Sequence, residues 1–286
     1  MTHRAQTKGR PQGSAAPAPA HAASPRTQRR RPPPHTIATV ALIAALIYLV
    51  AVSTVFKLTS GEHAPAVAAI VDQLSLTQPN PGFADRAAHT LMEAGYSVDY
   101  YPGEEITVDF YRNLPLGDYK LILLRNHSSV AQQTGGVGLF TSEPYSETRY
   151  VEEQRAGHFG RAHYYDGGAY YFAVHPKFIE SSAGGRFDDT LVIMMGCQGL
   201  LKSNMAEALV DKGALAVIGW DGLVSAAHSD AATELLVRHL LADELTVGEA
   251  IAETMSEVGP DPAYGSSLLF YPPESAADLQ EASLAR

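Results

Sequence analysis

The sequence predicts an α/β domain with a mostly parallel sheet, preceded by one transmembrane helix. From residue 66 onward, short apolar runs alternate with helical patterns, and repeated strand–helix units build a parallel sheet with helices on both faces. Before this alternation lies a stretch of 21 residues without a charge, which is the length that spans a bilayer. No internal repeat of 20–50 residues is visible, which argues against a solenoid.

The first 56 residues divide into a tail and a membrane span. Residues 1–35 carry seven Lys and Arg and no Asp or Glu, in a Pro- and Ala-rich context that predicts disorder because it buries too little apolar surface. Residues 36–56 read TIATVALIAALIYLVAVSTVF. A cleavable signal has a shorter apolar region, and the run is apolar on every face, which argues against a buried core helix. We therefore expect a signal-anchor helix, with cleavage near residues 64–69 as the alternative.

The charge distribution sets the expected orientation and limits the partners. Only Lys57 follows the span closely, so the positive-inside rule places the tail in the cytoplasm and the linker at residues 57–65 outside. The chain has 21 basic and 31 acidic residues, of which 14 and 31 lie beyond the tail. This acidic balance argues against a nucleic-acid partner, since phosphate binding needs basic surface. The tail is interpreted as a topology determinant, with binding to anionic headgroups as the alternative.

The extracytoplasmic domain is expected to span residues 66–272, with a C-terminal tail at residues 273–286. Its strands are expected at residues 66–71, 96–101, 121–124, 191–196 and 214–220, and its helices near 83–95, 108–114, 203–212, 226–242 and 247–256. Residues 128–188 interrupt this order with many Gly, Tyr, Ser and His, which predicts hairpins or loops. Long irregular insertions are commonly lids or binding loops.

Two apolar runs lead to the residues that a thiol hydrolase needs. The run at residues 121–124 is followed closely by His127, and the run at residues 191–196 ends at Cys197, the single cysteine of the chain. Sites in parallel α/β sheets form at the carboxyl ends of the strands, and a thiol nucleophile needs a nearby base. We therefore predict a catalytic dyad of His127 and Cys197. The alternatives are a buried, unreactive cysteine and a histidine that only bonds a carbonyl.

The block LVIMMGCQGLLKSNMAEALVDKGALAVIGWDG resembles the second half of the caspase-hemoglobinase fold of clan CD cysteine peptidases, a group that includes gingipains, caspases and CHAT-domain proteases. In these families an apolar strand ends in the catalytic cysteine, and an earlier strand ends in the catalytic histidine. The resemblance implies a three-layer α/β domain. It also implies that Cys197 is the nucleophile and His127 the general base or acid.

The same resemblance implies an oxyanion hole made by the backbone N–H groups of Ser128 and Cys197. The family usually has Gly where this chain has Ser128, and a site that needs a positive φ there would strain a serine. Gly196 stands where small or acidic residues are common in the family. Neither departure removes a catalytic atom.

Trp220 and Asp221 follow the last predicted strand, which is expected to lie beside the Cys197 strand. Relatives place the pocket for the residue before the cleaved bond there, so Asp221 is expected to pair with Lys or Arg of a substrate. An ordinary turn with a core tryptophan is the alternative. The spacings of His158, His163 and His175 match no tight metal-ligand motif, and neither a metal nor another cofactor is expected.

The function predicted is that of a membrane-anchored, extracytoplasmic cysteine endopeptidase that acts on peptides or proteins. The alternative is a catalytically inactive protein of the same fold that holds a peptide or glycan through its Tyr- and Gly-rich insertion. A third class, the amidotransferase-like hydrolases, uses a Gly-x-Cys-x-Gly elbow. Met195 occupies the first glycine position of that elbow, which argues against this class.

Overall fold

The computed structural model describes residues 47–48, 65–132, 135–181 and 183–273. The expected cytoplasmic tail and nearly all of the expected span at residues 36–56 therefore lie outside the described residues. Within the described part, none of the helices combines the length and apolar character that a membrane crossing requires. The chain separates into two units at residues 1–62 and 63–286, and the second unit contains the α/β domain.

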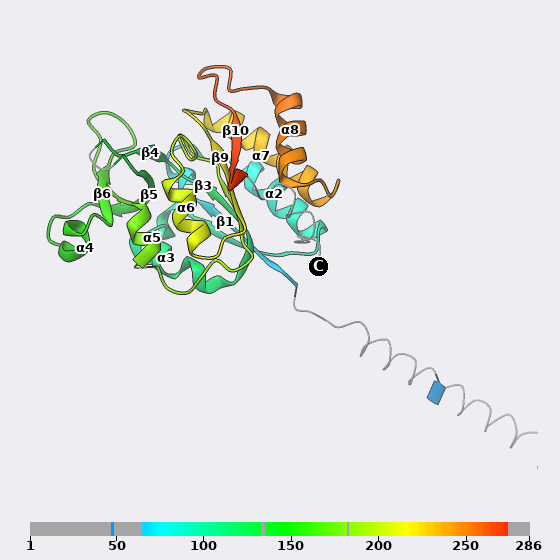
Figure 1. Ribbon diagram of the computed structural model, residues 1–286, viewed down its shortest axis with the longest axis horizontal. Helices are drawn as coiled ribbons and strands as arrows, with labels where there is room; N and C mark the ends of the chain where they lie inside the picture. Colours follow the sequence, from blue (N-terminus) through cyan, green and yellow to red (C-terminus); the bar gives the residue numbers. More distant parts are fainter. Residues whose placement is uncertain (1–46, 49–64, 133–134, 182, 274–286) are drawn as a thin grey trace, which may run out of the picture. The chain divides into compact units, whose positions relative to one another are not determined.

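The domain is built on a six-stranded sheet with the order β10-β9-β8-β3-β1-β2, seen between the helices in Figure 1. Its strands are β1 (Val67–Asp72), β2 (Ser97–Pro102), β3 (Tyr119–Arg125), β8 (Leu191–Met194), β9 (Ala216–Trp220) and β10 (Leu268–Tyr271). All neighbours are parallel except β9 and β10, which are antiparallel. The predicted mostly parallel sheet is confirmed, as is the pairing of the last predicted strand with the Cys197 strand. The edge strand β10 was not predicted.

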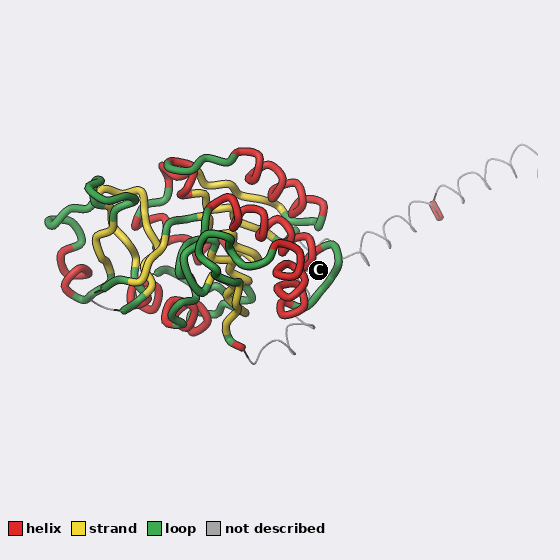
Figure 2. The backbone as a smooth tube through the Cα atoms, turned by 90° about the horizontal axis from the view of Figure 1, so that it is seen from above, coloured by secondary structure: helices red, strands yellow, loops and turns green. Residues whose placement is uncertain are grey.

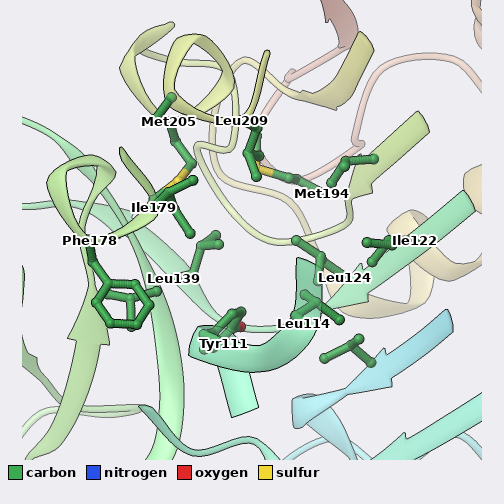
Figure 3. Close-up of a cluster of buried hydrophobic side chains, with 14 of the residues drawn as sticks. Tyr111, Leu114, Ile122, Leu124, Leu139, Phe178, Ile179, Met194, Met205 and Leu209 are labelled. Atoms are coloured by element: carbon green, nitrogen blue, oxygen red, sulfur yellow. The ribbon is translucent and has the colours of Figure 1, made fainter. Parts of the chain in front are cut away.

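Helices cover both faces of this sheet and make three layers. One face packs against α2 (Pro81–Glu93), α7 (Ala226–Leu241) and α8 (Val247–Val258), and the other packs against α3 (Val108–Asn113), α5 (Pro176–Ser181) and α6 (Asn204–Asp211). Alternate strand residues enter the two core clusters: Leu121 and Leu123 face α2 and α7, whereas Ile122 and Leu124 face α3 and α6. Figure 3 shows side chains of α3, α5 and α6 converging on those of β3 and β8. This two-sided burial explains why the inner strands β1, β3, β8 and β9 are largely apolar.

The helix termini follow local capping rules. Asn80, the N-cap residue of α2, accepts a hydrogen bond from the Phe83 N–H. Thr246 and Glu249 form a capping box at the start of α8. Both arrangements satisfy N–H groups that a helix leaves unpaired at its N-terminus.

The insertion at residues 128–188 forms a second sheet, which is followed by the helix α5 that packs on the main sheet. It contains β4 (Ser128–Val130), β5 (Val137–Pro144), β6 (Phe159–Ala162) and β7 (Tyr171–Val174) in the order β4-β5-β7-β6, all antiparallel, with the short helix α4 (Val151–Arg155). Its strands stand to one side of the main sheet in Figure 2. The predicted hairpins are confirmed, and β4 begins directly after His127.

Candidate functional site

His127 and Cys197 lie at the same edge of the main sheet. The strands β3 and β8 are parallel neighbours paired from Leu121 with Leu191 to Leu124 with Met194, and each residue follows its strand by two or three positions. Parallel pairing carries both turns to the carboxyl edge of the sheet, where sites of α/β proteins form. Both residues are half-buried.

The two turns contact each other directly. The Ser128 hydroxyl donates a 2.6 Å hydrogen bond to the Cys197 carbonyl oxygen, and the Val130 N–H donates a 3.0 Å bond to Gln198 Oε1. A Cβ atom at Gly196 would overlap the Asn126 carbonyl oxygen and the Ser128 hydroxyl. Only glycine therefore permits this approach of the two strand ends.

Backbone N–H groups are available beside the thiol. The Cys197 N–H has no hydrogen-bond partner within the part of the chain that the structure describes. Because the Phe140 N–H donates to the His127 carbonyl at 2.9 Å, the alternation of an antiparallel ladder turns the Ser128 N–H away from β5. It then points to the same side as the Val130 N–H, toward the Gln198 segment. The Ser128 N–H, one of the two groups expected to form an oxyanion hole, thus faces the segment that follows Cys197.

The backbone conformation of the turn that contains Cys197 is unusual at one position. Gln198 has φ 59°, in the left-handed region that costs non-glycine residues strain. Its side chain accepts from Val130, and its N–H donates to the Gly222 carbonyl at 2.7 Å. Ser128 has no positive φ, so the serine in place of the usual glycine carries no strain.

The His127 ring has a hydrogen-bond partner at its Nε2 atom and an aromatic ring stacked on one face. Its Nε2 lies 3.0 Å from Thr77 Oγ1, and its backbone N–H donates to Gln73 Oε1 at 3.0 Å. The Tyr164 ring stacks on the imidazole with centroids 5.1 Å apart and an interplanar angle of 23°. When Nε2 donates its hydrogen to Thr77, Nδ1 keeps a lone pair, and Nδ1 has no hydrogen-bond partner among the described residues.

Burial makes this histidine a neutral group. Desolvation and, to a smaller extent, the positive charge of Arg125 together lower the pKa of His127 to about 4. At neutral pH the imidazole is therefore uncharged and can accept a proton. A resting ion pair of imidazolium and thiolate is disfavoured, because burial penalises the charged form.

A buried ion cluster fixes the end of β3 beneath the site. Arg125, which is 1% exposed, donates two hydrogen bonds to the carboxylate of Asp230 at 2.7 and 2.9 Å and one to Asp72 at 2.7 Å. It also donates to the Gln78 carbonyl at 2.9 Å. Asn80 donates to Asp230 at 2.8 Å. The cluster joins β1, β3, α7 and the start of α2 two residues before His127.

The Cys197 thiol forms hydrogen bonds with the loop that follows β9. Its Sγ lies 3.4 Å from the Val224 carbonyl oxygen, and the Val224 N–H donates to Sγ at 3.5 Å. No hydrogen bond joins Sγ to His127 within the described residues. The Leu200 N–H donates to the Trp220 carbonyl at 2.9 Å, so the segment after Cys197 runs beside the end of β9.

The two predicted pocket residues occupy different environments. Trp220 is fully buried, and its indole N–H donates to Ser229 Oγ at 3.0 Å. A side chain without exposed surface cannot pack on a substrate, so Trp220 is a core residue here. Asp221 is half-exposed, and its Oδ1 accepts a 2.8 Å bond from the Ser267 N–H. Its second carboxylate oxygen has no hydrogen-bond partner within the described part.

The insertion histidines have separate partners. His163 Nδ1 lies 2.7 Å from the Tyr165 carbonyl, His175 Nδ1 lies 3.3 Å from the Gly157 carbonyl, and His158 Nε2 lies 3.2 Å from the Ser181 hydroxyl. No cluster of three His, Cys, Asp or Glu suited to a metal occurs in the described residues.

Several residues of the candidate site were not predicted from the sequence. Thr77, Gln73 and Tyr164 lie 50, 54 and 37 positions from His127 in the chain, and only the folded structure brings them to its ring and backbone. The density of tyrosines in the insertion was a signal for Tyr164. No family model matches this chain, and no curated protein matches it.

Proposed function

We propose that the protein is a cysteine endopeptidase whose catalytic pair is His127 and Cys197. The observation that carries this proposal is the close contact of the two strand-end turns, made by the bond from Ser128 to the Cys197 carbonyl and allowed by Gly196. It brings a nucleophile, a neutral base and free N–H donors to one sheet edge. Acyl transfer needs these three elements together.

The chemistry follows from the state of each group. The Nδ1 lone pair of neutral His127 takes the thiol proton as Sγ attacks the peptide carbonyl. The Ser128 and Cys197 N–H groups stabilise the oxyanion of the tetrahedral intermediate. The imidazolium then gives its proton to the leaving amine, and a thioester remains on Cys197. Water, deprotonated by the same imidazole, hydrolyses the thioester and restores the thiol.

The thiol must leave its resting hydrogen bonds before it reacts. The Sγ atom is hydrogen-bonded to the Val224 backbone, and the proposed mechanism requires it to exchange these bonds for the imidazole of His127. Catalytic hydrogen bonds in ligand-free enzymes are often long and tighten when substrate binds. Thr77 would meanwhile hold the opposite edge of the imidazole, which makes it a positioning residue.

The proposal includes a preference for Arg or Lys before the cleaved bond, and this preference rests on Asp221. Its free carboxylate oxygen lies on a loop that contacts the Cys197 segment, and a carboxylate binds guanidinium or ammonium groups through charge-assisted hydrogen bonds.

The proposed location is outside the cytoplasm, anchored by residues 36–56. This part of the proposal is supported by the length and apolar composition of that stretch and by the basic residues before it. Protease added to right-side-out vesicles should digest the α/β domain and spare the tail. Digestion of the tail with protection of the domain would reverse the proposed topology.

A catalytically inactive binding protein is the second candidate. It is favoured by one observation, namely that the His127 ring bonds to Thr77 and the Cys197 thiol to Val224 instead of to each other. In this candidate the insertion holds a peptide or glycan and the thiol is never activated.

Covalent labelling separates the two candidates. A peptidyl acyloxymethyl ketone, whose carbonyl must sit between the nucleophile and the oxyanion donors, is incubated with the full-length protein in detergent. The endopeptidase proposal expects modification of Cys197 and a rate at least 10-fold lower in His127→Gln, because general base catalysis contributes about 100-fold or more. Equal rates in the two proteins would favour the binding protein.

A further inference from the structure

An aromatic stack extends from the candidate base into the insertion. Tyr164 stacks on the His127 ring, and Tyr171 stacks on Tyr164 with centroids 4.3 Å apart and an interplanar angle of 18°. The Tyr164 hydroxyl donates a 2.8 Å bond to the Thr141 carbonyl in β5. This bond fixes the stack to the insertion sheet, so its position relative to the imidazole is set by the fold.

Both tyrosines of this stack keep accessible surface. Tyr164 and Tyr171 are half-buried, unlike Phe172 and Phe159, which fill the core of the insertion. The aromatic surface continues along the connection between β6 and β7, where Tyr165 is 68% exposed and Tyr170 is 45% exposed. Neighbouring exposed aromatic side chains mark binding surfaces more often than isolated ones do.

The chemistry of peptide cleavage identifies which part of a substrate meets this surface. The proton on the imidazole goes to the leaving amine, so the residue after the cleaved bond must lie against His127 at that step. The residue before the bond stays on Cys197 as the acyl group. The surface that adjoins the imidazole, and not the one that adjoins the thiol, therefore contacts the leaving segment.

We infer that the Tyr164–Tyr171 stack binds the residues that follow the cleaved bond and selects aromatic or large apolar side chains at the first of these positions. This inference rests on the proposed endopeptidase function and adds the substrate class on the leaving side. Flat aromatic rings offer large apolar contact area and favour offset stacking or edge contacts with a substrate ring.

The charges around the stack are consistent with an uncharged substrate side chain. Tyr164 has its hydroxyl bonded to a carbonyl, and Tyr171 makes no ion pair within the described residues. The nearest cation along the insertion, Arg161, lies over the Tyr170 ring at 4.8 Å. The two stacked rings carry no charge themselves, which favours an uncharged substrate side chain over a basic one.

The test is a cleavage profile of the full-length protein in detergent against a mixture of peptides randomised on both sides of the bond, read by mass spectrometry. The variant is Tyr171→Ala, and the matched control is Tyr171→Phe, which keeps the ring. The ratio of kcat/KM for peptides with Phe, Tyr or Leu after the bond to that for peptides with Ser or Gly should fall about 2- to 10-fold in Tyr171→Ala. The profile before the bond should not change in either variant.

Each result decides the inference. An unchanged profile after the bond in Tyr171→Ala would overturn it, as would an equal change on both sides. If Tyr171→Ala unfolds, Tyr171→Leu, which removes the ring but keeps an apolar side chain, must show the loss for Phe and Tyr. Turnover by the wild type with no preference after the bond would contradict this inference alone. Absence of turnover by the wild type would contradict the proposed function and the inference with it.

Discussion

Ser128 and Cys197, which lie 69 positions apart in the chain, are joined by a hydrogen bond of 2.6 Å from the Ser128 hydroxyl to the Cys197 carbonyl oxygen. The bond locks the turn after β3 to the turn after β8. It also gives the serine at this position a role that a glycine could not have, since glycine has no hydroxyl. Ser128 thus makes a structural contact between the two halves of the candidate site.

Gly196→Ala should impair catalysis more than folding. Its Cβ would overlap the Asn126 carbonyl and the Ser128 hydroxyl, which forces the two turns apart. A displacement of about 1 Å at a catalytic pair can cost about 100-fold in rate, so kcat/KM for peptide cleavage should fall by about that factor. Gly138→Ala is the control, because its Cβ would meet only ordinary contacts at 3.4 Å or more. Comparable losses in both variants would refute the contact as the cause.

The acid limb of activity should lie near pH 4. Burial lowers the pKa of His127 to about 4, so the ring stays an unprotonated base down to that pH. A solvent-exposed histidine would instead lose activity near its ordinary pKa of about 6.5. The pH dependence of kcat/KM reports this group in the free enzyme, and an acid limb near 6.5 would contradict the assignment.

The same pKa sets a pH dependence of stability. The unfolded histidine binds a proton below about pH 6.5, whereas the folded one does so only below about pH 4. His127 therefore contributes stability that is fully present above pH 6.5 and is lost as the pH falls toward 4. The measurement is the decrease in unfolding free energy between pH 7 and pH 4.5. This decrease should be smaller in His127→Gln than in the wild type, because the glutamine does not bind a proton.

Removing Arg125 should destabilise the domain strongly. Arg125→Met leaves Asp72 and Asp230 buried without their cation, which costs about 3–5 kcal/mol. Trp220, the single tryptophan and fully buried, reports unfolding in urea by its fluorescence. The control is Arg155→Met, because Arg155 pairs with Glu152 at 71% and 85% side-chain exposure and the pair should contribute little. An equally small effect of both variants would show that the cluster does not hold the strand ends.

Asp221→Asn should weaken cleavage after Arg and Lys. Loss of a charge-assisted hydrogen bond corresponds to about 10- to 100-fold in kcat/KM, and cleavage after uncharged residues should stay unchanged. Asp85→Asn on the exposed face of α2 serves as the control. A constant preference in Asp221→Asn would leave Asp221 with only a structural role, in which its carboxylate accepts the Ser267 N–H at the start of β10.

The sequence predicted those parts of the fold that local patterns encode. Apolar runs located four of the six main-sheet strands, and periodicity located the longer helices, because burial on both faces or on one stripe leaves a direct pattern. The strand β2 was predicted from a Tyr-rich segment at residues 96–101. The strand β10 has only four residues and lies at the edge of the sheet. A pattern this short cannot be distinguished from that of a loop. Trp220 could not be assigned from its position, since whether a strand-end side chain turns to the core depends on its packing partners.

The site was predictable only at its two strand ends. His127 and Cys197 follow apolar runs and could be identified from the sequence. The residues that surround them come from distant segments of the chain. Arg125 and Asp230 are 105 positions apart, and nothing in either local sequence shows that they pair. Thr77 is likewise one of many exposed turn residues until the fold places it 3.0 Å from His127 Nε2.

The central claim is that His127 and Cys197 act together on peptide bonds. The most direct measurement is cleavage of a randomised peptide mixture by the full-length protein, compared with Cys197→Ala, which removes one sulfur and is expected to leave the fold intact. Cleavage by the wild type, its loss in Cys197→Ala and a fall of about 100-fold or more in His127→Gln are predicted. Cleavage that persists in Cys197→Ala, or a folded wild type that cleaves none of the peptides, would contradict the claim.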